Sequence, residues 1–128
     1  MSKRKGTNAE RELVRTFWKN GWAAVRVAGS GSSHYPSPDI LVGREGRRLA
    51  IEAKITVDDK KYFPQDEINQ LKYFANTFGA EAWIAVKFIG ILWVFFSLED
   101  LNETTKSYVI SKTDVDLKGL TFEDLIGN

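Results

Sequence analysis

The chain is organised around the octapeptide RLAIEAKI at residues 48–55. Its alternating pattern is typical of a β-strand, in which successive side chains point to opposite faces of a sheet. One face of this strand is apolar, whereas the other carries Glu52 and Lys54. A buried charge is costly unless it is paired or bound to a metal. The stretch is therefore either an edge strand with a solvated salt bridge or a strand that contributes both charges to a functional site.

The length of 128 residues suits one domain with its own hydrophobic core. We expect a flexible basic arm at residues 1–6 and a single folded domain at residues 7–128. No apolar run approaches the roughly 18 residues of a membrane span. No apolar segment follows the basic start of the chain, so a signal peptide is not predicted either.

The composition excludes several kinds of site. Cysteine is absent, which rules out disulfides, thiolate metal sites and a cysteine nucleophile. The single histidine, His34, argues against a histidine-based zinc site.

Charge is distributed unevenly between the two halves of the chain. Residues 1–64 carry 13 Lys and Arg against 7 Asp and Glu, whereas residues 65–128 carry 5 against 10. A basic half favours an anionic partner such as nucleic acid. Such asymmetry also occurs without a binding role, so charge alone does not decide the partner.

The first predicted element is a helix that starts at Thr7 and ends near Asn20-Gly21. Thr7 and Glu10 have the spacing of a capping box, and an apolar stripe follows at helical spacing. Glu10 lies beside that stripe. It is either a capping residue or a carboxylate directed toward a site beneath the helix.

Three strands are expected next, at residues 22–28, 39–43 and 48–55. The Gly, Ser and Pro residues at 29–38 indicate a flexible loop between the first two. A tight turn at residues 44–47 joins the last two as a hairpin. Asp39 therefore begins a strand adjacent to the one that carries Glu52 and Lys54.

The second half continues with a polar loop at residues 56–63 and a helix from Pro64 to Gly79. Ile68, Leu71, Ala75 and Phe78 form its predicted buried stripe. Strands at residues 82–88 and 91–97 are apolar on both faces, from which we expect a dimer contact. The tail contains a possible edge strand at residues 107–112 and a helical turn capped by Thr121.

Glu10, Asp39, Glu52 and Lys54 are thus predicted to meet near one end of a small sheet. Carboxylates with a lysine suit a hard divalent cation such as Mg²⁺, since clustered carboxylates without a cation repel one another. A cation held in this way polarises a phosphate and activates water. The set therefore suits metal-assisted hydrolysis of a phosphodiester.

Pro38-Asp39, followed after 12 residues by Glu52-Ala53-Lys54, is the PD-(D/E)xK nuclease pattern. Together with GTNAEREL at residues 6–13, VRVAGSGS at residues 25–32 and AVKF at residues 85–88, it resembles archaeal-type Holliday-junction resolvases. The resemblance implies an α/β fold with a restriction-endonuclease-like core, in which helices flank a central mixed five-stranded sheet. It also implies a twofold homodimer that cuts paired strands of a four-way DNA junction in recombination and repair.

The resemblance makes Glu10, Asp39, Glu52 and Lys54 catalytic residues, with the three carboxylates as ligands of Mg²⁺, for which Mn²⁺ is able to substitute. We expect DNA contacts from seven residues, namely Lys5, Arg11, Arg26, Ser30, Ser32, Lys60 and Lys61. We expect a dimer interface at Phe74, Phe78, Trp93 and Phe95. A cytoplasmic, nucleoid-associated location without membrane contact follows from this function.

Three other interpretations stay open from the sequence. The chain could be another PD-(D/E)xK endonuclease that acts on linear or damaged duplex, or a DNA-binding subunit without catalysis. His34, Tyr35 and Lys54 could also mimic the metal-free site of an RNA-splicing endonuclease. Such an enzyme would keep cutting in EDTA.

Overall fold

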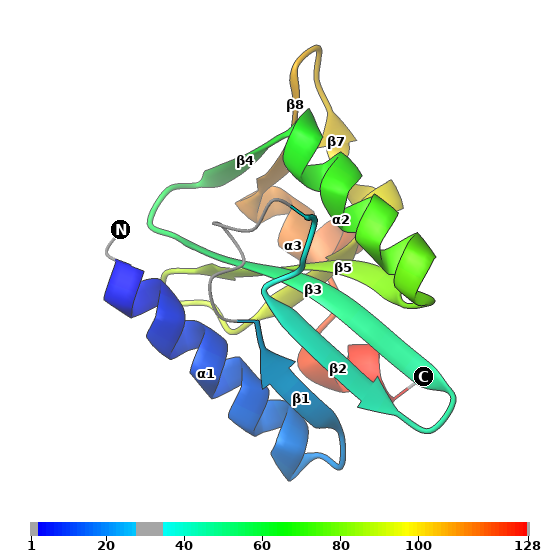
Figure 1. Ribbon diagram of the computed structural model, residues 1–128. Helices are drawn as coiled ribbons and strands as arrows, with labels where there is room; N and C mark the ends of the chain where they lie inside the picture. The colour runs from blue at the N-terminus through cyan, green and yellow to red at the C-terminus, as the bar shows by residue number, and fades with distance from the viewer. Residues whose placement is uncertain (1–2, 28–34, 128) are drawn as a thin grey trace.

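The computed structural model describes residues 3–27 and 35–127 as one α/β arrangement (Figure 1). The helices are α1 (Lys3–Lys19), α2 (Gln65–Phe78), α3 (Lys112–Lys118) and α4 (Phe122–Ile126), with a short 3₁₀ turn, η2 (Leu98–Asp100). The strands are β1 (Ala23–Arg26), β2 (Ile40–Arg44), β3 (Arg47–Thr56), β4 (Lys60–Pro64), β5 (Glu81–Phe88), β6 (Val94–Ser97), β7 (Asn102–Glu103) and β8 (Ser107–Ser111). None of the helices in this described part is both long and apolar enough to cross a membrane.

The main sheet confirms the predicted mixed five-stranded arrangement, with the strand order β1-β2-β3-β5-β6. β1, β2 and β3 form the predicted antiparallel meander. β5 pairs with β3 in parallel, because the chain crosses over through α2 between these two strands. The octapeptide at residues 48–55 therefore lies in the middle strand of the sheet, and the interpretation as an edge strand is wrong.

Helices cover both faces of this sheet, as Figure 1 shows. One hydrophobic cluster joins α1 and α4 to the face that includes Leu49 and Ile51. A second cluster joins α2 to the face that includes Ala50, Ile84 and Val86. β3 is thus packed on both sides, and its charged residues Glu52 and Lys54 are partly covered by neighbouring elements.

This coverage corrects one prediction about the dimer interface. Trp93 is 9% exposed and Phe95 is fully buried, both in the cluster with α1 and α4. Phe95 contacts Phe122 of α4, with ring centroids 6.2 Å apart. Residues of the tail cover Phe95, and Trp93 is almost fully buried, so these two side chains leave little surface for a second copy.

A second sheet, with the order β4-β8-β7, corrects two further predictions. The segment with Lys60 and Lys61 is a strand rather than a loop, because it pairs along its length with residues 107–111. β8, predicted at an edge, is the middle strand of the three. β4 and β8 lie far apart in sequence, so local patterns did not indicate that these two strands pair.

Most of the predicted helix ends are confirmed, including the end of α1 at Lys19, just before Asn20-Gly21. Gly79 ends α2 in the left-handed conformation, with φ of 87°. The backbone N–H of Asp124 donates to Thr121 Oγ1, which confirms the cap of α4. The capping box at Thr7 is wrong, however, because α1 already begins at Lys3 and includes part of the segment predicted as a flexible arm. α2 also buries less than predicted, since Phe78 is 51% exposed.

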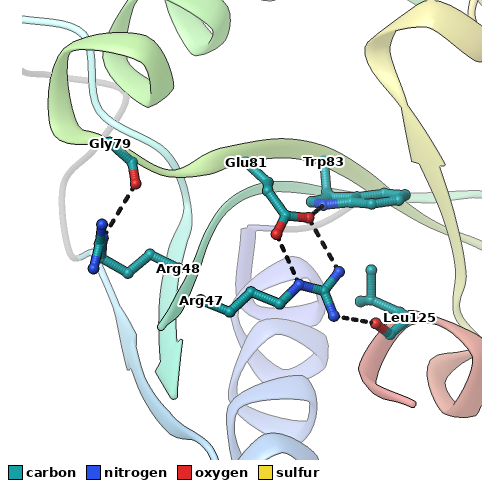
Figure 2. A network of polar contacts seen from close by, with 6 residues as sticks. All are labelled: Arg47, Arg48, Gly79, Glu81, Trp83 and Leu125. Carbon is teal, nitrogen blue, oxygen red and sulfur yellow. Dashed lines mark hydrogen bonds and ion pairs between the residues drawn. The ribbon is translucent and has the colours of Figure 1, made fainter. Parts of the chain in front are cut away.

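An arginine network ties the sheet to the C-terminal helix (Figure 2). Arg47 Nε donates to Glu81 Oε2 at 2.7 Å and its Nη1 donates to the Leu125 carbonyl at 2.6 Å. Trp83 Nε1 donates to the same carboxylate at 3.0 Å. Because Arg47 begins β3, this side chain connects β3, β5 and α4. Arg48 separately donates to the Gly79 carbonyl at 3.1 Å.

Candidate active site

The charged face of β3 forms a compact ionic group near the end of the strand. Lys54 Nζ lies 3.7 Å from Glu52 Oε2 and 3.0 Å from Glu67 Oε1. Glu67 belongs to the first turn of α2, which packs on this face of the sheet. The side chains of Glu52, Lys54 and Glu67 are 14%, 31% and 28% exposed. The group is therefore half-enclosed while remaining open to solvent on one side.

Asp39 lies beside this group, directly before β2. Its Oδ2 accepts a hydrogen bond from the Ala53 backbone N–H at 2.9 Å. The Asp39 backbone is held on both sides, since its N–H donates to Ile51 and its carbonyl accepts from Val27. The hairpin therefore places the carboxylate of Asp39 against the stretch that carries Glu52 and Lys54, as predicted.

Glu10 comes from α1 on the opposite layer and is held by an arginine. Glu10 Oε1 lies 3.5 Å from Arg26 Nη1, and the two side chains are 19% and 24% exposed. Burial raises the pKa of Glu10, and the charge of Asp39 raises it further, while Arg26 and Lys54 act in the opposite direction. Glu10 is thus within electrostatic range of Asp39 and Lys54, although its direct partner is Arg26.

Burial raises the pKa of Glu52 to about 9, with further contributions from the charge of Asp39 and from a hydrogen bond with Glu67. Burial alone would raise the pKa of Glu67 as well, but the bond with Glu52 and the Lys54 ammonium lower it overall. Burial opposes the charge on Lys54, yet Glu67 and Glu52 raise the pKa of its ammonium. In the absence of a cation, burial and the charge of Asp39 therefore favour the protonated form of Glu52, whereas Glu67 and Glu52 favour the charged form of Lys54.

The carboxylates of the site are the kind of ligand that a hard cation prefers. They do not surround a cation position completely. Within residues 3–27 and 35–127, no three His, Cys, Asp or Glu side chains lie together as a metal-binding group. The predicted cluster of three carboxylates is therefore not formed. Mg²⁺ commonly takes one or two carboxylates and fills its other positions with water and phosphate oxygens. Asp39 and Glu52, whose charges repel each other across the hairpin, fit that pattern.

The predicted DNA-binding residues are distributed over several elements. Arg11 is exposed on α1, and Lys60 is exposed on β4. Lys61 is half-buried and close enough to Glu67 to lower the pKa of that carboxyl. The side chain of Lys5 lies outside the described part of the structure, as do Ser30, Ser32 and His34.

Glu67 is the site residue that the sequence analysis did not find. Its position in the first turn of a helix has an ordinary explanation, since acidic side chains favour that turn through the helix dipole. The available signal was the crossover itself. A helix that joins two parallel neighbouring strands must pack on one of their faces, and here its first turn is on the face of Glu52 and Lys54.

Fold and site together define a class of protein. A mixed sheet whose middle strand carries Glu52-Ala53-Lys54, beside Asp39 from the preceding strand, is the arrangement of a PD-(D/E)xK nuclease. A family model described as archaeal Holliday junction resolvase matches residues 1–128. The chain belongs to this family, whose members are metal-dependent nucleases.

Individual relatives agree with this assignment. The crossover junction endodeoxyribonuclease Hjc of Archaeoglobus fulgidus is 43% identical over 125 residues, which cover 98% of this chain and 91% of the relative. The corresponding Methanocaldococcus jannaschii protein is 34% identical over 124 residues, with 97% and 88% covered. A solved structure of Archaeoglobus fulgidus Hjc, described as a Holliday junction resolvase from an archaeal hyperthermophile, superposes with a TM-score of 0.88 at 40% identity, with 97% of each chain covered.

Proposed function

We propose that this chain is an endodeoxyribonuclease that resolves four-way DNA junctions by metal-dependent hydrolysis of symmetrically placed phosphodiester bonds. The observation that carries the proposal is the joint position of Asp39, Glu52 and Lys54 at the middle strand of the sheet in a member of this family. Residues 7–128 would form the single nuclease domain, working on DNA in the cytoplasm and nucleoid.

The described side chains have separate roles in this reaction. Asp39 and Glu52 would hold the cation, and Mg²⁺ is the one we propose, with Mn²⁺ as a substitute. When bound, it supplies charge stabilisation and an activated water. Lys54 stays charged beside Glu52 and would stabilise the negative charge that develops on the phosphate. Glu10, held by Arg26, would contribute negative charge from α1. It would not complete the set of metal ligands.

A twofold dimer would match the near-twofold symmetry of a junction and place two sites on opposed strands. Phe74 and Phe78 stack with ring centroids 5.4 Å apart, and the exposed Phe78 borders an apolar groove of about 300 Å³ beside β1 and β2. This face is our proposed interface. Sedimentation equilibrium should give twice the chain mass of 14.5 kDa, and a monomer at micromolar concentration would argue against it.

DNA binding would depend on charge and shape more than on base sequence. Arg11, Arg26, Lys60 and Lys61 are the basic residues with described positions that we propose as backbone contacts, with Lys5, Ser30 and Ser32 added from the sequence. Contacts to phosphates make affinity strongly salt-dependent. Selectivity for the branch would come from its shape and deformability.

The decisive experiment compares a labelled immobile four-way junction with linear duplex of equal length, in Mg²⁺ and in EDTA. We expect wild type to nick the junction at two symmetric positions only with Mg²⁺. Asp39→Asn should bind the junction and leave it intact, because the variant keeps the shape of the side chain but loses its charge. Equal cutting of linear duplex, or cutting in EDTA, would contradict the proposal.

A further inference from the structure

Lys54 is held between two carboxylates, of which only one was expected. The nearer partner is Glu67, at 3.0 Å, whereas Glu52 is at 3.7 Å. Attraction between opposite charges weakens with distance, so the ion pair with Glu67 is the closer and stronger of the two. The closest contact that orients the ammonium therefore comes from α2 and not from β3.

Glu67 is well placed to act on Lys54 because its own backbone is fixed. α2 follows β4 without an intervening loop, and the helix buries Ile68 and Leu71 against the sheet. Glu67 is thus followed directly in the chain by Ile68, which belongs to the hydrophobic core. By contrast, Asp66 in the same helical turn is exposed and accepts a hydrogen bond from Gln70 Nε2 at 2.9 Å.

We propose that Glu67 is a positioning residue for the junction-cutting reaction, which holds the Lys54 ammonium beside Glu52 and so at the phosphate that is cut. This inference rests on the proposed function. Lysine carries its charge on a flexible four-carbon stem, so one partner on its own strand restrains it weakly. A second carboxylate from a packed helix removes much of that freedom before the substrate arrives.

Effective stabilisation of a developing charge requires that the charged group already be in place. The loss of an outer partner that orients a reacting group commonly costs 10- to 100-fold in activity. Glu67 is not expected to touch the phosphate itself. It acts through Lys54, and this distinguishes it from Glu52, which faces both the lysine and Asp39.

The test uses Glu67→Gln with Asp66→Asn as the matched control. Each substitution removes one negative charge from the first turn of α2, so both change the helix dipole and the overall charge equally. We expect Glu67→Gln to slow single-turnover cleavage of the junction by about 10- to 100-fold, with junction affinity in EDTA and the thermal midpoint close to wild type. Asp66→Asn should leave all three unchanged.

A double-substitution cycle with Lys54→Ala separates positioning from other roles. If Glu67 acts through Lys54, Glu67→Gln adds little to the loss of cleavage that Lys54→Ala already causes. The inference is overturned by fully additive effects, by equal losses in Asp66→Asn, or by normal cleavage in Glu67→Gln. Wild type that fails to cut the junction would instead overturn the proposed function.

Discussion

β3 carries a charged group near each end, and the two groups differ in how well their charges are matched. At the start of the strand, hydrogen bonds between Arg47 and Glu81 raise the pKa of the guanidinium and lower that of the carboxyl. Near the other end, burial and the charge of Asp39 raise the pKa of Glu52 to about 9. The first group is satisfied within the chain, whereas the second holds more negative charge than its lysine can balance.

This difference separates a structural ion pair from a site. Arg47 gains a bidentate partner and a backbone carbonyl, so nothing further is needed at that end (Figure 2). Burial and the nearby negative charge of Asp39 favour the protonated form of Glu52 in the metal-free protein. Strongly shifted ionisable groups of this kind mark functional sites more often than structural ones. A cation that displaces the proton would convert the unfavourable group into a stable one.

The largest expected effect comes from a substitution at Glu52, in the group whose charges are not balanced. Glu52→Gln should reduce junction cleavage by on the order of 10²- to 10³-fold, since it removes a proposed cation ligand. The same change should not lower the thermal midpoint of metal-free protein, because glutamine resembles the protonated carboxyl already present. Cleavage assays and thermal unfolding in EDTA check both parts. A large loss of stability with normal cleavage would make this end of β3 structural as well.

The second effect is a pH dependence of stability confined to the metal-free protein. The pKa of Glu52 is about 9 in the folded chain and near 4.5 when unfolded. Between these values the folded state binds the extra proton, so its stability falls as pH rises from about 5 to 9. Glu10, whose pKa is also raised, acts in the same direction. Glu67, with a lowered pKa, contributes only below this window.

Thermal unfolding in EDTA at pH 5, 7 and 9 measures this dependence. Glu52→Gln should flatten the dependence of the thermal midpoint on pH, because this variant lacks the titrating carboxyl group. Saturating Mg²⁺ should reduce the same pH dependence in wild type. A wild-type profile as flat as that of Glu52→Gln would show that Glu52 is ionised in the metal-free protein.

The smallest effect is expected at the satisfied end of the strand. Arg47→Met removes the hydrogen bonds to Glu81 and Leu125 but keeps an apolar stem beside Trp22. Because Glu81 is 44% exposed and can be hydrated, we expect a loss of only about 1–2 kcal/mol in the free energy of unfolding. Cleavage should stay near wild type. Lys87→Met, which breaks the more exposed pair with Glu12, is the control and should cost less than about 0.5 kcal/mol. A drop in cleavage with Arg47→Met would show that the two ends are coupled.

The main features of the sheet could be predicted because their signals are local. Alternating residues, the tight turn at residues 44–47 and Gly79 at the end of α2 each depend on nearby sequence. The same holds for Asp39, Glu52 and Lys54, since one hairpin brings them together. Most of what a short stretch of chain determines by itself was predicted correctly, although the local capping box at Thr7 was wrong.

Most of the features that were missed depend on residues far apart in sequence. β4 is a strand only because β8 pairs with it, and Phe95 is buried only because α4 covers it. Glu67 reaches Lys54 through the packing of α2 on β3. None of these contacts leaves a periodic pattern, and helix-dipole chemistry already explained an acidic residue at position 67.

The direct joining of β4 to α2 at Pro64 has a mechanical consequence. Lys60 and Lys61 lie on a strand that continues without a loop into the helix that carries Glu67. No loop separates β4 from α2, so we expect a shift of the β4 backbone to move the first turn of α2 as well. A ligand that displaced the two lysines would then also move the Glu67 carboxylate, which lies 3.0 Å from Lys54 Nζ. Binding at the second sheet would thereby change the geometry of the site.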